Sequence, residues 1–261
     1  MNEWIKKRVE IFKSLDKAVL LQTLVIDMLF LAVVLFIGKY IGSLIPADPV
    51  KLMEMFGTQG KLLLFAVGYP VVYYVFAIFL YSIAKLHILK MITPHRKIGM
   101  SELPKFFLLN ILVFGGIFLI GLIVMMVLAV AFKQDFLKYI ILVLGVPYLI
   151  LAYTIFNLSH SHFAKGDRQG LIRISLKDPF LHLGYLPYDL LFFAGFFIVF
   201  NVINVILRYT IFLNQGMLSS FGPVYIKIYN ALFLIVIYAV VAFNRIFFVK
   251  NVLQQHKPDL S

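Results

Sequence analysis

The sequence predicts an all-α, polytopic membrane protein in which six transmembrane helices form three helical hairpins. Of its 261 residues, 62% are hydrophobic and 14% are charged, and the mean hydropathy is +0.96. Soluble domains carry about 25% charged residues, so this composition is typical of a chain embedded in lipid. A helix needs about 20 apolar residues to cross the hydrocarbon core. Six stretches are long enough: residues 18–38, 62–84, 106–132, 137–158, 186–208 and 224–248.

Positive charges predict the orientation of these helices. When successive loops are assigned to alternate sides, 17 of the 24 Lys and Arg residues fall on the side that holds both termini. Because Lys and Arg are enriched in cytoplasmic loops, we expect an integral cell-membrane protein with its N- and C-termini in the cytoplasm. We name these 17 residues the basic collar; they lie in residues 1–17, 85–105, 163–186 and 245–261.

The basic collar accounts for most of the formal net charge of +12, since only seven acidic residues lie on the same side. A basic surface beside a membrane attracts anionic lipid headgroups, by about 1 kcal/mol per Lys or Arg. We therefore expect anionic membrane lipids as partners. Nucleic acid is not expected, because membrane orientation already explains the charge.

Two segments outside the six spans have the composition of interfacial structure. In residues 1–17, which precede a six-span domain at residues 18–261, Lys6 and Lys13 alternate at helical spacing with Val9 and Phe12. This pattern predicts an amphipathic helix lying in the membrane interface. Within residues 167–178, the run IRISLK alternates apolar and polar side chains and so could form a strand. An isolated strand beside a membrane has no partner strand, so we expect an irregular interfacial helix that ends at Pro179.

An internal repeat supports the arrangement in hairpins. Residues 61–82 align without gaps on residues 138–159, and the residues DMLFLA at 27–32 resemble DLLFFA at 189–194. The predicted repeats are residues 18–84, 106–158 and 186–248. Because each repeat begins and ends on the same side, they would be related by a pseudo-threefold axis along the membrane normal.

The repeat alignment also pairs two glycine–proline motifs in the even-numbered helices. Gly68 and Pro70 match Gly145 and Pro147. Proline inside a helix frees a carbonyl group and permits a kink, and interruptions at equivalent positions of repeats are a pointer to a transporter site. Prolines in membrane helices also adjust packing alone. We therefore predict kinks at both motifs, with transport left open.

Asp27, Asn110 and Asp189 occupy equivalent positions near the cytoplasmic ends of the odd-numbered helices. An ionised carboxylate inside a bilayer is costly, so such residues are candidates for binding a cation, a proton or a polar substrate group. Alternatively, each side chain reaches the interface or caps a neighbouring helix, and Arg245 lies at a matching depth for Asp189. These four residues are the candidate binding site.

A second polar stripe lies on the fifth helix, where Asn201, Asn204 and Arg208 recur at intervals of three and four and so share one face. They could line an aqueous vestibule or bond across helices. We favour packing, because no acidic residue that could pair with Arg208 is evident on the stripe.

The stretch NLSHSHFAKGDRQG at residues 157–170 raises the possibility of a metal site at His160 and His162. Side chains two residues apart on a helix point in different directions, so the two rings cannot bind one ion while the helix is intact. We therefore predict the exit of the fourth helix, with no metal ion and no cofactor. The chain contains no cysteine and no recognisable catalytic motif, so no catalytic residue is assigned.

Three functions remain open from the sequence. The favoured one is a non-enzymatic membrane component that binds lipid, a membrane-protein partner or a second copy of itself through the basic collar. The alternative is a small permease or an ion or proton pathway that uses the intramembrane acids. The third is a membrane enzyme that acts on lipid headgroups through a histidine-rich face.

Overall fold

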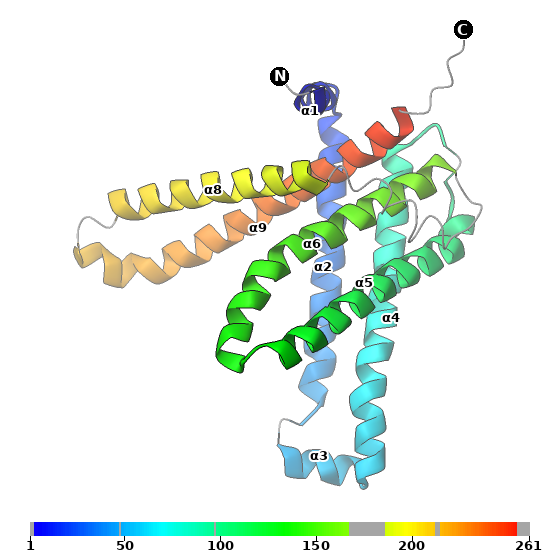
Figure 1. The fold of residues 1–261 in the computed structure, drawn as a ribbon, viewed down its shortest axis with the longest axis vertical. Helices are drawn as coiled ribbons and strands as arrows, with labels where there is room; N and C mark the ends of the chain where they lie inside the picture. Colours follow the sequence, from blue (N-terminus) through cyan, green and yellow to red (C-terminus); the bar gives the residue numbers. More distant parts are fainter. Residues whose placement is uncertain (1–2, 47, 97, 167–185, 212–214, 255–261) are drawn as a thin grey trace. The chain divides into compact units, whose positions relative to one another are not determined.

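A computed structural model describes residues 3–46, 48–96, 98–166, 186–211 and 215–254. Every element in these ranges is a helix (Figure 1), as the sequence predicts. The elements are α1 (Glu3–Lys13), α2 (Lys17–Leu44), α3 (Pro49–Phe56), α4 (Gln59–Ile92), the 3-10 helix η1 (Met100–Glu102), α5 (Leu103–Ala131), α6 (Gln134–Lys165), α8 (Leu186–Ile211) and α9 (Gln215–Gln254). The predicted interfacial segment at residues 167–178 lies outside the described residues.

Six helical segments are long and apolar enough to cross a membrane, and each overlaps one of the six predicted stretches. They are Lys17–Leu44, Gln59–Ile92, Met100–Ala131, Tyr139–Lys165, Leu190–Leu207 and Val224–Asn251. The chain is therefore a membrane-embedded protein by the length and composition of its helices.

Local caps, rather than hydropathy, set the ends of these helices. The hydroxyl of Thr58 accepts a hydrogen bond from the backbone N–H of Lys61 at 3.4 Å, and α4 then continues to Ile92, eight residues beyond the predicted span. At 34 residues, α4 is about 51 Å long, more than the thickness of the hydrocarbon core. Helix α6 likewise extends to Lys165 and ends at Gly166, whose φ of 93° suits glycine. Residues 85–92 and 163–165, which the sequence assigned to loops, are therefore helical, as are residues 159–162 at the predicted helix exit.

Helix α3 was not predicted, although its boundaries are encoded locally. The carboxylate of Asp48 accepts a hydrogen bond from the backbone N–H of Val50 at 2.9 Å, and Pro49 occupies the first helical position. The helix ends at Gly57, in the left-handed conformation with φ 70°. The segment is short and only moderately apolar, so a search for membrane spans passes over it.

The chain divides into two compact units, and one boundary between them falls within α5. Residues 16–114 form the α2/α4 unit, and residues 1–15 with 115–261 form the α6/α9 unit. In the α2/α4 unit, α2 packs along α4, and α3 packs against the beginning of α4 (Figure 1).

One contact between α2 and α4 requires glycine. The hydroxyl of Tyr73 donates a hydrogen bond to the backbone carbonyl of Val34 at 2.8 Å. Gly38 lies one turn further along α2, and a Cβ atom there would come within 2.6 Å of the Tyr73 oxygen. Glycine at this position therefore allows the phenol to reach the helix backbone.

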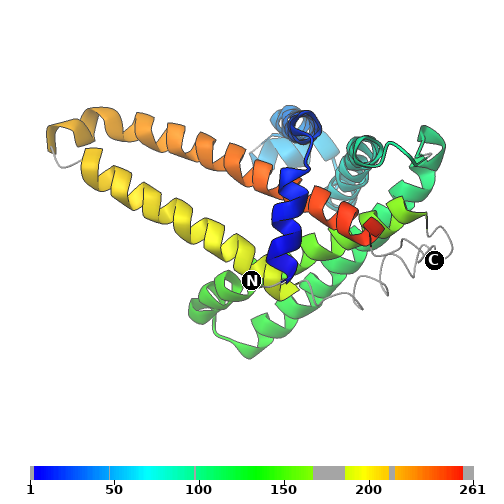
Figure 2. The same ribbon diagram turned by 90° about the horizontal axis from the view of Figure 1, so that it is seen from above.

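In the α6/α9 unit, α6 packs against both α8 and α9, and α1 contacts α9. Helices α8 and α9, yellow and orange in Figure 2, lie side by side. The hydroxyl of Tyr153 on α6 donates to the backbone carbonyl of Val241 on α9 at 2.9 Å. Tyr148 of α6 donates in the same way to the carbonyl of Ile117 on α5.

Burial is concentrated near one end of the helices in each unit. In the α2/α4 unit, Ile88 of α4 and Phe106 of α5 have no exposed surface; in the α6/α9 unit, the same holds for Leu158 of α6 and Phe247 of α9. Towards the opposite ends, large apolar side chains are exposed, for example Leu64 at 73%. This distribution is compatible with helices whose polar ends pack together while their apolar ends contact lipid.

Candidate functional site

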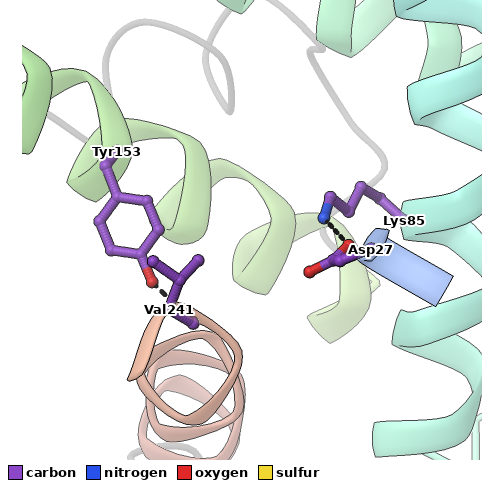
Figure 3. Close-up of polar contacts among 4 residues, drawn as sticks. All are labelled: Asp27, Lys85, Tyr153 and Val241. Atoms are coloured by element: carbon purple, nitrogen blue, oxygen red, sulfur yellow. Dashed lines mark hydrogen bonds and ion pairs between the residues drawn. The ribbon is translucent and has the colours of Figure 1, made fainter. Parts of the chain in front are cut away.

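The Asp27 carboxylate is the first candidate residue, and the structure pairs it with a residue that was not predicted. Asp27 of α2 forms an ion pair with the ammonium group of Lys85 on α4 (Figure 3), and the two side chains are only 3% and 5% exposed. A charge buried away from water is costly unless an opposite charge lies beside it. Asp27 and Lys85 each provide the opposite charge that the other needs.

Asn110 contacts α4 one helical turn away from the ion pair. Its Nδ2 donates a hydrogen bond to Oγ of Ser82 at 2.9 Å, and this hydroxyl donates in turn to the carbonyl of Ile78 at 2.7 Å. Ser82 and Lys85 are three residues apart and so lie on one face of α4. We name Asp27, Ser82, Lys85 and Asn110 the α4 polar network. All four are buried.

Aromatic rings surround the charged part of this network. The Lys85 ammonium lies 5.0 Å from the centre of the Tyr81 ring, within the range of a cation–π interaction. Tyr81 makes edge-to-face contacts with Phe30 at 5.6 Å and with Phe114 at 5.2 Å between ring centres. Such apolar surroundings strengthen the attraction between the two charges and also raise the cost of leaving either one unpaired.

Thr23 adds a further polar group, one turn before Asp27 on α2. It has no exposed surface, and among the described residues its hydroxyl has no hydrogen-bond partner. Hydroxyl groups on helices commonly bond to the carbonyl four residues earlier, but this one does not do so. The buried end of α2 therefore carries one more hydrogen-bonding group than the network uses.

The α4 polar network brings together two of the four candidate residues. Asp27 and Asn110 lie against successive turns of α4, whereas Asp189 and Arg245 belong to the other unit, in α8 and α9. The side chain of Asp189 lies outside the described residues, and Arg245 is buried, at 5% exposed. A ligand-binding role for the four residues remains a prediction. What the geometry adds is that the charge of Asp27 is already neutralised by Lys85.

The asparagines of the second polar stripe make contacts within the protein. Nδ2 of Asn201 donates to the carbonyl of Phe197 on its own helix at 2.8 Å, and Oδ1 of Asn204 accepts from the hydroxyl of Tyr225 on α9 at 2.7 Å. The Asn204 bond crosses between helices, whereas the Asn201 bond stays within α8, and the role of the stripe remains a prediction. The side chain of Arg208 lies outside the described residues.

Both glycine–proline motifs lie inside continuous helices. Pro70 is within α4 and Pro147 within α6, each preceded at two residues by its glycine, Gly68 or Gly145. A Cβ atom on either glycine would meet no atom within 4 Å. Kinks at these positions remain a prediction.

His160 and His162 lie in the last two turns of α6, and both side chains are buried. His160 is 1% exposed and His162 is 6% exposed, and the ring of His160 contacts that of Phe156 edge-to-face at 6.1 Å. Within the described ranges, no group of three His, Asp or Glu side chains is arranged to hold a metal ion. Helix α6 continues past these residues because its glycine stop comes only at Gly166.

Among the collar residues that the structure describes, three are buried and do not contribute to its surface: Arg8, Lys85 and Arg245. The guanidinium of Arg8 lies 4.3 Å from the ring centre of Phe192 on α8 and 4.4 Å from that of Phe247 on α9. A loop assignment alone does not show which cations are solvated, because aromatic rings and acids inside the protein can also stabilise a positive charge. Lipid binding by the exposed part of the collar remains a prediction.

Sequence reasoning missed Ser82 and Lys85 as site residues. Their spacing of three, with both on the face that receives Asp27 and Asn110, was a usable signal. It was hidden because the predicted span ended at residue 84, which placed Lys85 in a loop.

Comparison with protein-family models, with curated protein sequences and with solved structures finds no match to this chain.

Proposed function

We propose that the protein is a non-catalytic, multi-pass membrane component that binds anionic lipid headgroups through the exposed part of the basic collar. The observation that carries this proposal is that some Lys and Arg side chains of the basic collar are buried while others are exposed. Arg8, Lys85 and Arg245 are buried, whereas Lys17, Lys90 and other collar lysines are exposed. Exposed cations beside a membrane surface have anionic headgroups as their nearest abundant counter-charges.

The positions of the exposed lysines support this proposal in the α2/α4 unit. Three of them lie in terminal turns of the helices that carry the buried α4 polar network. Lys17 is the first residue of α2, Lys90 is in the last turn of α4, and Lys105 is in the first turn of α5. Cations at the packed end of the unit would face one membrane surface together, as the proposed cytoplasmic orientation requires.

The state of Asp27 argues against the permease alternative. A transport site must exchange its ion or proton with water on each side in turn, and its acid must be available to the substrate. Asp27 is 3% exposed and is paired with Lys85. The ion pair supports a structural role, in which it fixes the packing of α2 on α4.

We also propose that the six spans form three hairpins with both termini in the cytoplasm. The first two hairpins share a similar contact, in which the acceptor and the glycine recur at equivalent positions, whereas the tyrosines do not: Tyr73 aligns with residue 150 and Tyr148 with residue 71. Tyr73 bonds to the Val34 carbonyl beside Gly38, and Tyr148 bonds to the Ile117 carbonyl beside Gly121. In both, the glycine lies four residues after the carbonyl acceptor.

Lipid retention by the purified protein tests the proposed function. The protein would be delipidated in detergent and titrated with phosphatidylglycerol or phosphatidylcholine, with bound lipids counted by native mass spectrometry. We expect preferential binding of phosphatidylglycerol. The collar variant changes three exposed lysines: Lys17→Gln, Lys90→Gln and Lys105→Gln. At about 1 kcal/mol per lysine, it should lower phosphatidylglycerol affinity by roughly 100-fold.

A matched control removes the same charge from the opposite ends of the same unit. The control variant changes three other exposed lysines: Lys39→Gln, Lys51→Gln and Lys61→Gln. It should retain the affinity of the original protein. Equal losses in the two variants, or no preference for phosphatidylglycerol, would refute headgroup binding by the collar. Solute flux in proteoliposomes that is lost in Asp27→Asn while the variant remains folded would instead favour the permease.

A further inference from the structure

An apolar groove of about 460 Å³ lies between α5 and α6, within the α6/α9 unit. Its walls include Phe118, Leu122 and Met125 from α5, and Leu144 and Leu149 from α6. These side chains remain 41–65% exposed, so the groove is open to the surroundings of the protein. Its volume is within the range of sites that hold small ligands.

Two glycines form part of the walls, and only one of them leaves open space. Gly121 on α5 is covered by Tyr148, whose oxygen would lie 2.6 Å from a Cβ atom at that position. Gly145 on α6 also lines the groove, but a Cβ atom there would meet nothing within 4 Å. The wall at Gly145 is therefore hollow, and a side chain added there would project into free space.

The chemistry of the walls identifies the occupant. All of the lining side chains are apolar except Tyr148, whose hydroxyl is already bonded to the carbonyl of Ile117. A polar ligand would lose its hydration without gaining hydrogen bonds. Moreover, the span that contributes α5 has a mean hydropathy of 3.0, the highest of the six. On a span this apolar, the groove would face hydrocarbon, where lipid acyl chains are the abundant apolar molecules.

A second copy of the chain fits these observations less well. Helices from different copies approach closely in membranes where small residues offer a flat face to the partner. Here Gly121 is already covered by Tyr148 from the same chain, and the remaining surface at Gly145 is a recess between bulky side chains. A narrow flexible chain suits such a recess better than a helix does.

We propose that this groove is a binding site for one acyl chain of a membrane lipid. The proposal rests on the proposed lipid-binding function and adds a tail site to the headgroup surface, although the two sites are formed by different residues. Gly145 is the specificity-determining position, because its missing side chain leaves the volume that the acyl chain fills.

Photocrosslinking tests the proposal with the full-length protein in vesicles of phosphatidylcholine that carries a diazirine in its acyl chain. Adducts would be mapped by peptide mass spectrometry. We expect them to concentrate in residues 118–128 and 141–149. Gly145→Leu fills the recess and should lower the yield there by about tenfold, the effect of losing contact with two methylene groups.

The matched control is Gly68→Leu, which makes the same change two residues before the other helical proline. A Cβ atom at Gly68 also meets nothing within 4 Å, and Gly68 does not line the groove. Both variants replace glycine by a better helix former, so neither should lose stability. The control should retain the full adduct yield.

Adducts spread evenly over the exposed apolar faces, or an equal yield in Gly145→Leu and Gly68→Leu, would overturn the acyl-chain site. So would a change from dimer to monomer caused by Gly145→Leu, because a second copy would then be the occupant. Phosphatidylcholine carries no net charge, so this result is independent of headgroup binding by the basic collar. Failure of either proposal is therefore distinguishable from failure of the other.

Discussion

Breaking the ion pair between Asp27 and Lys85 should strongly destabilise the protein. Asp27→Asn keeps the shape of the side chain but leaves the Lys85 ammonium, 5% exposed, without its counter-charge. Removing one partner of a buried pair costs about 3–5 kcal/mol. For a chain of this size each kcal/mol lowers the unfolding temperature by about 2–4 °C, so we expect a shift of roughly 6–20 °C. Heat unfolding in lipid nanodiscs measures it.

A double variant tests whether the instability comes from an unpaired charge or from the loss of polar side chains as such. Asp27→Leu with Lys85→Met removes both charges while keeping apolar volume, and such replacements of buried pairs are often neutral or stabilising. We expect its stability to return to within about 1 kcal/mol of the original. The control Glu54→Gln removes an exposed carboxylate from α3 and should have almost no effect. If Asp27→Asn is as mild as Glu54→Gln, or if the double variant is as unstable as the two single changes combined, the pair is not a structural element.

Three further predictions concern contacts within the two units. Gly121→Ala places a Cβ atom 2.6 Å from the Tyr148 oxygen and should cost about 1–3 kcal/mol in the free energy of unfolding, partly restored by adding Tyr148→Phe. Ser82→Ala removes the acceptor of the Asn110 side chain and should cost about 1–3 kcal/mol; Asn110→Leu with Ser82→Ala should cost less, a difference that a double-mutant cycle measures. Arg8→Gln removes the guanidinium that lies on two aromatic rings and should increase protease cleavage near residue 8, while an unchanged cleavage rate would show that α1 is held by other contacts.

The fold was predictable to the extent that burial in lipid dictates it. Hydropathy located all six apolar helices because a spanning segment must be continuously apolar over about 20 residues. Helix ends were missed by up to nine residues, as at the start of α9, because apolar content does not mark them; the end of α6, for example, is set by the glycine stop at Gly166. Helix α3 was missed for the same reason, although Asp48, Pro49 and Gly57 mark its ends.

The candidate site was predicted in part. Asp27 and Asn110 stood out because polar groups within apolar spans are costly, and both proved to be buried against α4. Lys85 could not be identified while it was assigned to a loop, since the positive-inside rule treats every cation beyond a span as solvated. Pairing between distant helices depends on their rotation and depth, and a single sequence records neither.

The bonds from Tyr73 to Val34 and from Tyr148 to Ile117 end on main-chain oxygen atoms. Every amino acid carries that oxygen, so the residue identities at 34 and 117 are free to change without loss of the link. Only the phenol and the neighbouring glycine are restricted. During evolution, the surface around each crossing can therefore adapt to bilayers of different thickness or composition while the two helices stay joined.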